Sequence, residues 1–345
     1  MAVTDPGLAA VLDASFPFAL PMTRRFRGLR AREGMLIKGP RGWGEFAPFD
    51  DYTDASAARW LDSALEAAFG DWPAAVREVV AVNAIIPAVP SADAAGLARE
   101  AVLVNGCTTI KVKVGDPDLA DDEARVASIR DVLDTTLGRG VGRIRIDANG
   151  GWDVARAEVA LRRLGAYGLE YVEQPCRTVD ELREIRSLTS VPIAVDETVR
   201  MSDAPGRLRL ADFADVAVVK PAPVGGVRAA LRIIDSLDIP VVVSGSMDSS
   251  VGLDVGLATA AAMADLPFAC GFGTGALLAA DLTETPRMPV DGTLAVGRIL
   301  PDLPSLLAAR DRLDEDRAAW WRQRLAAAWL AGAGQRSGAL VRATA

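Results

Sequence analysis

The sequence has 345 residues, no histidine and a formal net charge of −8; 50% of its residues are hydrophobic and 24% are charged. This balance is typical of a globular protein with a large core, and the length allows two domains or one barrel with an appended domain. The negative charge disfavours nucleic acid and anionic membranes as partners. Without histidine, a Ser-His-Asp triad, a histidine base and a histidine zinc site are excluded, so acid/base chemistry needs carboxylate, lysine, tyrosine or cysteine.

The cysteines and the hydrophobic segments give no sign of secretion or membrane insertion. Cys107, Cys176 and Cys270 are far apart and odd in number, which indicates neither a disulfide framework nor a zinc site. No uncharged segment reaches the roughly 20 residues of a spanning helix. We therefore expect a soluble, cytoplasmic protein with no membrane partner.

The first 80 residues differ in pattern from the rest of the chain. Residues 26–38 and the glycine-containing turn at residues 39–42 predict an antiparallel hairpin, and residues 56–69 predict a helix. We expect residues 1–80 to form the N-terminal part of an α+β capping domain.

From residue 80 onward, short runs rich in valine and isoleucine alternate with segments of helical period. The runs cover residues 80–85, 109–114, 143–147, 169–173, 192–196, 216–220, 240–244 and 268–272. Eight parallel strands with helical crossovers are the number that closes a barrel, so the predicted fold class is α/β, a TIM-like (β/α) barrel over residues 81–284. Residues 285–345 predict a turn, a hairpin and a helix that return to the cap.

Acidic residues end three consecutive predicted strands. Asp147, Glu173 and Asp196 close the third, fourth and fifth runs, and the carboxyl ends of barrel strands form the active-site mouth. Three converging carboxylates need a compensating cation, and an all-oxygen ligand set suits Mg²⁺, with Mn²⁺ as a substitute. Each carboxylate alone is more typical of a helix N-cap, but three in succession favour a metal site.

Lysines accompany these carboxylates on two other strands. Lys111 and Lys113 alternate with apolar residues and so share one face of their strand, and Lys220 ends the sixth run. Lysines on strands are usually solvated edge residues, but a closed barrel has no such edge. A lysine base must be neutral near pH 7, and for Lys113 the neighbouring Lys111 and a metal ion can supply the repulsion that lowers its pKa.

Taken together, these segments resemble a known family. They are Lys111-x-Lys113, Asp147-Ala148-Asn149-Gly150-Gly151-Trp152, Glu173-Gln174-Pro175, Asp196-Glu197 and Lys220-Pro221 with Gly225-Gly226. Over residues 20 to 285, this order is similar to the enolase superfamily, muconate-lactonizing-enzyme subgroup, whose barrel is of the modified (β/α)7β type. The resemblance implies that Asp147, Glu173 and Asp196 hold Mg²⁺, and that Lys111, Lys113 and Lys220 are catalytic. Lysine base with magnesium is a recorded pattern of that superfamily.

Two further segments are similar to the actinobacterial type of o-succinylbenzoate synthase. They are the stretch from Phe26-Arg27-Gly28 to Gly44-Glu45 and the stretch Ser244-Gly245-Ser246-Met247-Asp248-Ser249-Ser250. The resemblance implies the Mg²⁺-dependent dehydration of 2-succinyl-6-hydroxy-2,4-cyclohexadiene-1-carboxylate to o-succinylbenzoate in menaquinone biosynthesis. Lys113 would act as base and then acid, and Lys220 would stabilise the enediolate. The expected substrate-binding residues are Ser244, Ser246, Asp248, Gly271, Gly273, Arg27 and Asn149.

Other functions stay open at this stage. Racemisation of N-acylamino acids, epimerisation and cycloisomerisation use the same lysines and metal, although Gly271 to Gly275 contains no carboxylate to hold the ammonium group of a dipeptide. The glycines of that segment also suggest a nicotinamide-dependent oxidoreductase, but they follow the last strand, where a dinucleotide fingerprint should follow the first. A non-catalytic barrel is disfavoured by the intact lysines and carboxylates. The partner is a small carboxylate substrate, and the oligomeric state is open.

Overall fold

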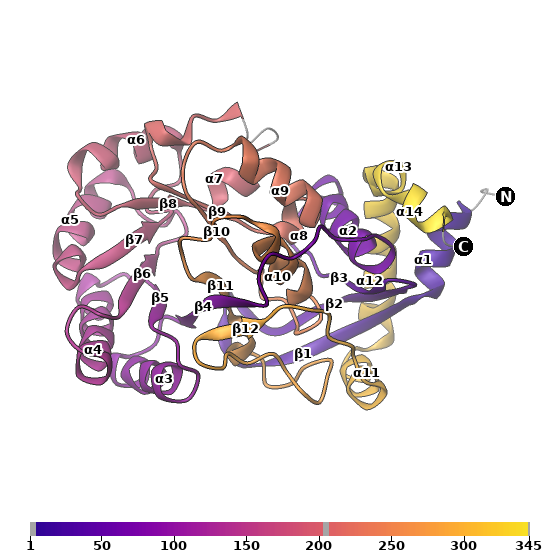
Figure 1. Ribbon diagram of the computed structural model, residues 1–345, viewed down its shortest axis with the longest axis horizontal. Coiled ribbons are helices and arrows are strands. Elements are labelled where there is room, and N and C mark those ends of the chain that lie inside the picture. The colour runs from indigo at the N-terminus through magenta and orange to yellow at the C-terminus, as the bar shows by residue number, and fades with distance from the viewer. Residues whose placement is uncertain (1–4, 203–206, 344–345) are drawn as a thin grey trace.

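The computed structural model describes residues 5–202 and 207–343. Residues 1–4, 203–206 and 344–345, which include the outermost residues of both expected cap segments, lie outside the described part. A curled, largely parallel sheet surrounded by helices stands beside a small antiparallel sheet with its own helices (Figure 1). The predicted α/β barrel class with a cap is confirmed.

The barrel strands follow the predicted runs closely. They are β4 (Val79–Ile86), β5 (Thr109–Lys113), β6 (Arg143–Asp147), β7 (Leu169–Glu173), β8 (Ile193–Val195), β9 (Val216–Val219), β10 (Val241–Val243) and β11 (Cys270–Gly273). The sheet order is β10-β9-β8-β7-β6-β5-β4-β11, and each of these neighbours pairs in parallel.

Helices connect these strands along the outside of the sheet. They are α3 (Ser91–Leu103), α4 (Leu119–Leu137), α5 (Val154–Leu164), α6 (Val179–Leu188), α7 (Glu197–Arg200), α8 (Pro221–Val224), α9 (Val227–Ser236) and α10 (Leu253–Ala262). Short 3₁₀ turns occupy Gly165–Tyr167, Leu210–Asp212 and Thr274–Leu277. No helix among the described residues is both long and apolar enough to cross a bilayer.

The two ends of the sheet meet at one parallel bridge. Ser244, just after β10, pairs with Gly271 of β11, and the N–H of Gly245 donates to the carbonyl of Gly271 over 3.0 Å. A Cβ on Gly271 would lie 2.3 Å from Ser244 Oγ, so glycine permits this approach. The bridge brings the seventh and eighth barrel strands together at the mouth.

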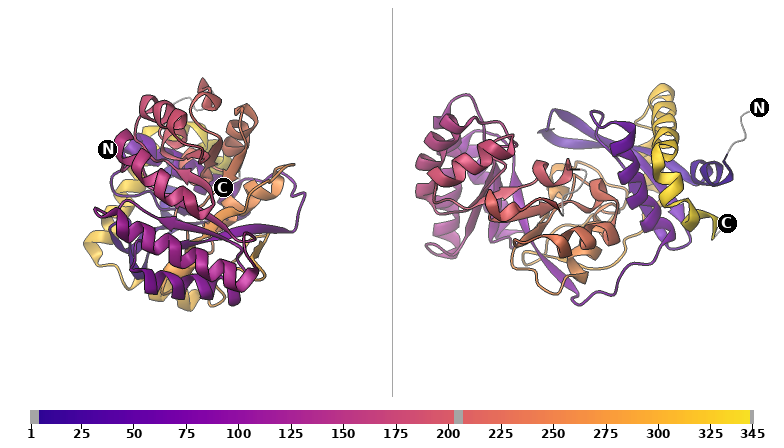
Figure 2. Two further views of the ribbon diagram at one scale, coloured as in Figure 1. Left: turned by 90° about the vertical axis from the view of Figure 1, so that its left-hand side faces the viewer. Right: turned by 90° about the horizontal axis from the view of Figure 1, so that it is seen from above.

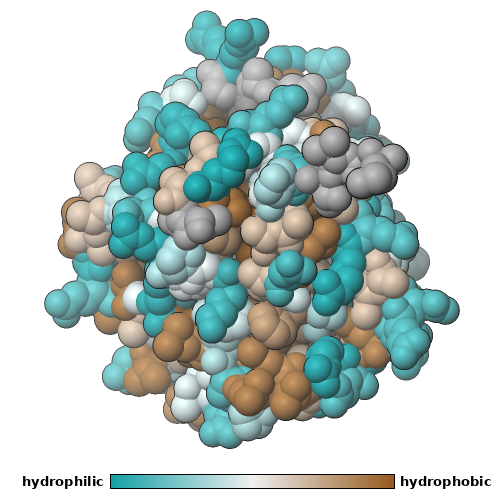
Figure 3. All heavy atoms as spheres, turned by 90° about the vertical axis from the view of Figure 1, so that its right-hand side faces the viewer, coloured by the Kyte–Doolittle hydropathy of each residue, from teal (hydrophilic) through white to brown (hydrophobic). Residues whose placement is uncertain are grey.

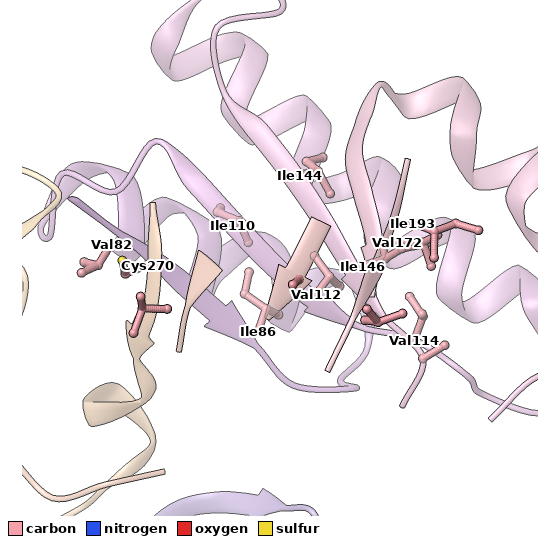
Figure 4. Close-up of a cluster of buried hydrophobic side chains, with 14 of the residues drawn as sticks. Val82, Ile86, Ile110, Val112, Val114, Ile144, Ile146, Val172, Ile193 and Cys270 are labelled. Carbon is pink, nitrogen blue, oxygen red and sulfur yellow. The ribbon is translucent and has the colours of Figure 1, made fainter. Parts of the chain in front are cut away.

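Alternation along the strands separates an apolar layer from a polar one. Ile110 and Val112 of β5 lie with Ile144 and Ile146 of β6 in the large buried cluster between sheet and helices (Figure 4). Lys111 therefore faces the inside of the barrel, as the two-residue period of a strand requires. Hydrophobic burial on one face of each strand thus directs the polar face to the barrel interior.

The cap combines both ends of the chain. Its N-terminal part contains α1 (Pro6–Asp13), β1 (Ser15–Phe26), β2 (Leu29–Gly39), β3 (Gly42–Phe46) and α2 (Asp54–Phe69). Its C-terminal part contains α11 (Leu303–Arg310), α12 (Glu315–Ala328), a π-helical turn at Trp329–Ala333, α13 (Gly334–Arg336) and α14 (Gly338–Arg342). The indigo and yellow segments lie together at one end of the molecule (Figure 2), and α12 packs on α2. The outer face of the cap mixes hydrophilic and hydrophobic residues (Figure 3).

Two details of the cap differ from the sequence expectation. The turn at residues 39–42 does connect two strands, but a second turn at Arg27 and Gly28, both with positive φ, makes the sheet three-stranded. The expected C-terminal hairpin is present as one tight turn, in which Val290 and Thr293 form an antiparallel bridge. The strand that follows, β12 (Thr293–Ala295), pairs antiparallel with residues 79–81 of β4 instead of extending that hairpin. β11 pairs with β4 from Val82 onward. Residues 79–81, at the start of β4, would therefore be an unpaired edge, and β12 covers it.

One buried carboxylate joins the cap to the barrel. Glu45 of β3 accepts hydrogen bonds from the N–H and hydroxyl of Ser249, in the segment that follows β10. Burial, reinforced by nearby Asp248, raises the pKa of Glu45 to about 7. The folded protein therefore holds a proton on Glu45 at pH values where the unfolded chain has released it.

We expect Glu45→Gln to flatten the pH dependence of stability between about pH 4.5 and 7. Because the folded state binds the extra proton in that window, the free energy of unfolding of the unmutated protein falls as pH rises, by up to roughly 3 kcal/mol. Above pH 7 both states have lost the proton and this contribution levels off. Urea unfolding at several pH values measures the slope, and an identical slope in the variant would contradict the assignment to Glu45.

Candidate active site

A cavity lies at the carboxyl ends of the barrel strands. Its lining includes ten of the thirteen residues that the sequence singled out: Lys111, Lys113, Lys220, Asp147, Asn149, Ser244, Ser246, Gly271, Gly273 and Arg27. The other three, Glu173, Asp196 and Asp248, are buried beside it.

Lys111 lies between two of the carboxylates. Its Nζ is 2.6 Å from Glu173 Oε1 and 3.0 Å from Asp147 Oδ2. Burial opposes the charge, but Asp147 and Glu173 outweigh it and hold the pKa of Lys111 above its ordinary value. This direction favours the charged form of Lys111 over the neutral form that a base needs.

Lys113 shares Asp147 with Lys111, but its pKa shifts in the opposite direction. Its Nζ is 2.8 Å from Asp147 Oδ2, and it lies 5.9 Å from the centre of the Phe26 ring of the cap. Burial lowers its pKa, Asp147 raises it and Lys111 lowers it, with a net shift below the ordinary value. This direction increases the neutral fraction of Lys113, as a base that removes a proton needs.

Lys220 belongs to the opposite side of the ring. It directly follows β9, four strands from β5 in a ring of eight, and its Nζ is 2.5 Å from Asp196 Oδ2. The other oxygen of Asp196 accepts from Arg200 Nε over 3.2 Å. Burial opposes ionisation of Asp196, but Lys220 and Arg200 hold its pKa below the ordinary value.

Asp147, Glu173 and Asp196 form a row of carboxylates across β6, β7 and β8, here called the acidic row, and Glu173 is its middle member. It pairs with Asp147 in register across β6 and β7, and only 1% of its surface is exposed. Burial raises its pKa to about 7, despite Lys111, with Asp147 and Asp196 adding to the rise. Like-charge repulsion from Asp147 and Asp196 thus adds to the effect of burial on Glu173.

The expected substrate-binding residues fall into two groups. Asn149 faces the cavity from a strained backbone position with φ +46°, and its side chain donates to Glu197 Oε1 over 3.2 Å. Arg27 faces it from the cap and lies 4.7 Å above the ring of Phe49. Asp248 does not line the cavity, because its Oδ2 turns back to accept from the N–H of Ser246 over 2.7 Å. In this structure, Asp248 shapes the segment after β10.

Sequence reasoning missed six lining residues: Phe26, Asn83, Ile85, Gly245, Met247 and Thr274. Asn83 offered a signal, since it interrupts an apolar strand, as Lys111 does. Thr274 follows the glycines of β11 directly. Apolar residues such as Ile85 and Met247 carry no signal, because core residues look the same in a sequence.

The acidic row fits a hard divalent cation by its chemistry, because all three groups offer oxygen. Among the described residues, no group of three or more carboxylates or thiols is arranged as a ready cage for a metal ion. The ammonium groups of Lys111 and Lys220 lie against the carboxylates instead. In this structure, the negative charge of the three carboxylates is thus compensated by lysine side chains.

Comparisons with known proteins agree with this geometry. Residues 93–304 match the family model described as enolase C-terminal domain-like, and residues 18–68 match the one described as enolase N-terminal domain-like. The chain belongs to the enolase superfamily. It is 49% identical over 313 residues to an o-succinylbenzoate synthase of Thermobifida fusca (strain YX), covering 90% of this chain and 94% of that one. It is 48% identical to an o-succinylbenzoate synthase of Mycolicibacterium smegmatis, covering 93% and 97%.

Solved structures share the fold at lower sequence identity. A muconate lactonizing enzyme from Pseudomonas fluorescens matches with a TM-score of 0.69 and 21% identity, over 89% of this chain and 97% of that one. The L-Ala-D/L-Glu epimerase from Bacillus subtilis matches with a TM-score of 0.67 and 21% identity, over 83% and 96%. The fold is therefore that of muconate-lactonizing-enzyme-like proteins.

We expect Asp147→Asn to destabilise the metal-free protein more than Glu173→Gln does. Asp147 is the acceptor shared by Lys111 and Lys113, and its loss leaves buried ammonium groups with one partner fewer, at roughly 3 kcal/mol. Glu173, with a pKa of about 7, is roughly half protonated at pH 7, so its change to glutamine removes less charge than the change at Asp147. Urea unfolding in excess chelator at pH 7 compares the two variants, and equal losses would contradict the central position of Asp147.

Proposed function

We propose that the protein dehydrates 2-succinyl-6-hydroxy-2,4-cyclohexadiene-1-carboxylate to o-succinylbenzoate, a hydro-lyase reaction of menaquinone biosynthesis. The observation that carries the proposal is the geometry of the cavity, which Lys111, Lys113 and Lys220 line together with Asp147. The unlike shifts of the two lysines of β5, upward for the pKa of Lys111 and downward for that of Lys113, agree with it. The synthases of 48–49% identity, matched over nine-tenths of the chain or more, support the choice of substrate.

Lys113 would transfer the proton in both halves of the reaction. Its neutral Nζ takes the proton from the ring carbon that bears the carboxylate, and the electron pair forms the enediolate. The same ammonium then gives that proton to the hydroxyl on the neighbouring carbon, the C–O bond breaks, and water leaves as the ring becomes aromatic. Since one side chain serves both atoms, proton and hydroxyl leave from the same face, a syn elimination.

Lys111 and Lys220 would act by charge. Lys111 stays ionised, disfavours a second ammonium beside it, and so helps to keep Lys113 neutral. Lys220 reaches the cavity from the opposite side, where its positive charge stabilises the enediolate.

Asp147, Glu173 and Asp196 would hold Mg²⁺, which Mn²⁺ can replace. When bound, the ion supplies positive charge to the substrate carboxylate as its second negative charge develops. Lys220 and Arg200 both favour the ionised form of Asp196, and the hydrogen bond from Arg200 Nε would hold this carboxylate in place for the cation.

We expect purified protein with Mg²⁺ to form o-succinylbenzoate from the cyclohexadiene substrate, and excess chelator to abolish this turnover. Mg²⁺ or Mn²⁺ should restore it, whereas Zn²⁺ should do so poorly, because no histidine is available to bind it. N-succinyl amino acids serve as comparison substrates, with racemisation followed by optical rotation. Full activity in chelator would contradict the metal assignment, and racemisation without dehydration would favour the racemase alternative.

We expect Lys113→Ala to remove essentially all dehydration, while Lys220→Ala slows it by lost charge stabilisation, about 10²- to 10³-fold. Turnover of the cyclohexadiene substrate measures both. In a two-base racemase, by contrast, each lysine serves one enantiomer. Stereospecific deuterium exchange into an N-succinyl amino acid by the Lys113→Ala protein would show that Lys220 is itself a base, against the unequal roles proposed here.

A further inference from the structure

Asn83 is a polar side chain of the cavity wall with a fixed orientation. It lies in β4, next to the strand of Lys113, and only 2% of its surface is exposed. Its Oδ1 accepts from Arg145 Nη1 over 2.9 Å. Arginine only donates hydrogen bonds, so the oxygen must face Arg145 and the NH₂ group must face the other way.

Arg145 is held tightly enough to set that orientation. It is fully buried inside the barrel on β6, where its Nε donates to Glu170 Oε2 over 2.6 Å and its Nη1 also donates to the carbonyl of Ala269 over 2.7 Å. Its guanidinium lies 4.8 Å from the centre of the Tyr171 ring. These contacts come from three separate segments, so the guanidinium cannot turn without losing several of them.

The amide of Asn83 keeps donor capacity for a ligand. Among the described residues, its Nδ2 donates to the carbonyl of Ala84 over 3.0 Å, which uses one of two hydrogens. A buried NH₂ group with a free hydrogen beside a cavity is a ready donor to an acceptor that enters.

Thr274 supplies a second donor on the same wall. It follows β11 directly, lines the cavity and is 7% exposed, and its hydroxyl is buried with no hydrogen-bond partner in the described part of the chain. Gly273 pairs with Ala84 across β11 and β4, and a Cβ on that glycine would lie 2.3 Å from the carbonyl oxygen of Asn83. This close backbone approach places Thr274 beside the strand of Asn83.

We infer that Asn83 and Thr274 form a polar subsite for a carbonyl oxygen of the substrate other than its reacting carboxylate, and that Arg145 is a positioning residue for Asn83. In the ring of strands, β4 and β11 lie on one side of Lys113, while the acidic row on β6 to β8 lies on the other. The two donors are neutral, which suits an uncharged carbonyl better than a buried carboxylate. The inference rests on the proposed function, in which the succinyl side chain carries such a ketone.

Two conservative substitutions test the donors separately. Asn83→Asp keeps an oxygen for Arg145 but replaces the NH₂ donor with a second oxygen; Thr274→Val keeps the shape but removes the hydroxyl. We expect kcat/KM to fall about 10-fold for Thr274→Val and further, about 100-fold, for Asn83→Asp, mainly through KM. Thr259→Val is the matched control, since Thr259 is fully buried in α10 and donates to the carbonyl of Val255 away from the cavity. It should leave KM unchanged.

The positioning role of Arg145 needs a coupled measurement. Arg145→Met should raise KM in the unmutated background but have little further effect on KM in an Asn83→Ala background, because the amide it orients is gone. A merely structural role would lower the melting temperature in both backgrounds and leave the two KM effects additive. Additive KM effects would therefore overturn this part of the inference.

Binding of o-succinylbenzoate, measured by titration calorimetry with Mg²⁺, separates the subsite from the reaction. If the unmutated protein binds this compound but does not form it, the proposed function fails; weaker binding by Thr274→Val, with unchanged binding by Thr259→Val, would still support the subsite. The subsite inference is overturned if both Asn83→Asp and Thr274→Val keep kcat/KM and the affinity for o-succinylbenzoate within twofold of the unmutated protein. Should Asn83→Asp fail to fold, the Thr274→Val result decides. An unmutated protein that neither converts nor binds the compound overturns both proposals.

Discussion

The structure depends on charge compensation within a buried barrel mouth. Asp147 is 3% exposed and accepts from both Lys111 and Lys113, so three ionisable side chains share one buried point. Isolated buried charges cost several kcal/mol each, and only mutual pairing makes such a group tolerable. The pairing is unequal, because Lys111 has a second carboxylate, Glu173, and Lys113 has not. One lysine therefore stays charged while its neighbour is displaced toward neutrality.

That difference in partners gives two identical side chains on one strand different electrostatic surroundings. Lys111 and Lys113 are separated by one residue and face the same way, so sequence distance alone gives no reason to distinguish them. The difference arises from Glu173, at the end of the next strand but one, which accepts a hydrogen bond from Lys111 and acts on Lys113 only at longer range. Register between strands thus determines the surroundings of a side chain as much as residue type does.

The cap is joined to the same network of charges. Arg200, which holds Asp196, also donates to the hydroxyl of Tyr52 in the cap over 2.5 Å. Phe26 and Arg27, at the tip of the first cap hairpin, complete the cavity wall. The cap therefore forms one wall of the cavity at the ends of the barrel strands. The hydrogen bonds of Arg200 to Tyr52 and to Asp196 link the cap to a carboxylate of the barrel. Burial at the mouth lowers the local dielectric constant and so strengthens each ionic contact there.

The sequence by itself determined the barrel, its strand runs and the polar residues at the strand ends, because a two-residue period and the parallel direction of βα units fix which side chains reach the mouth. It also determined the cap at both ends of the chain in outline. Only the tertiary structure decided that Asp248 turns away from the cavity to bind Ser246, and that β12 joins the barrel sheet. It alone also brought Asn83 and Thr274, nearly two hundred positions apart, onto one wall. Such contacts depend on closure of the ring and on packing between distant segments, and local periodicity carries no information about either.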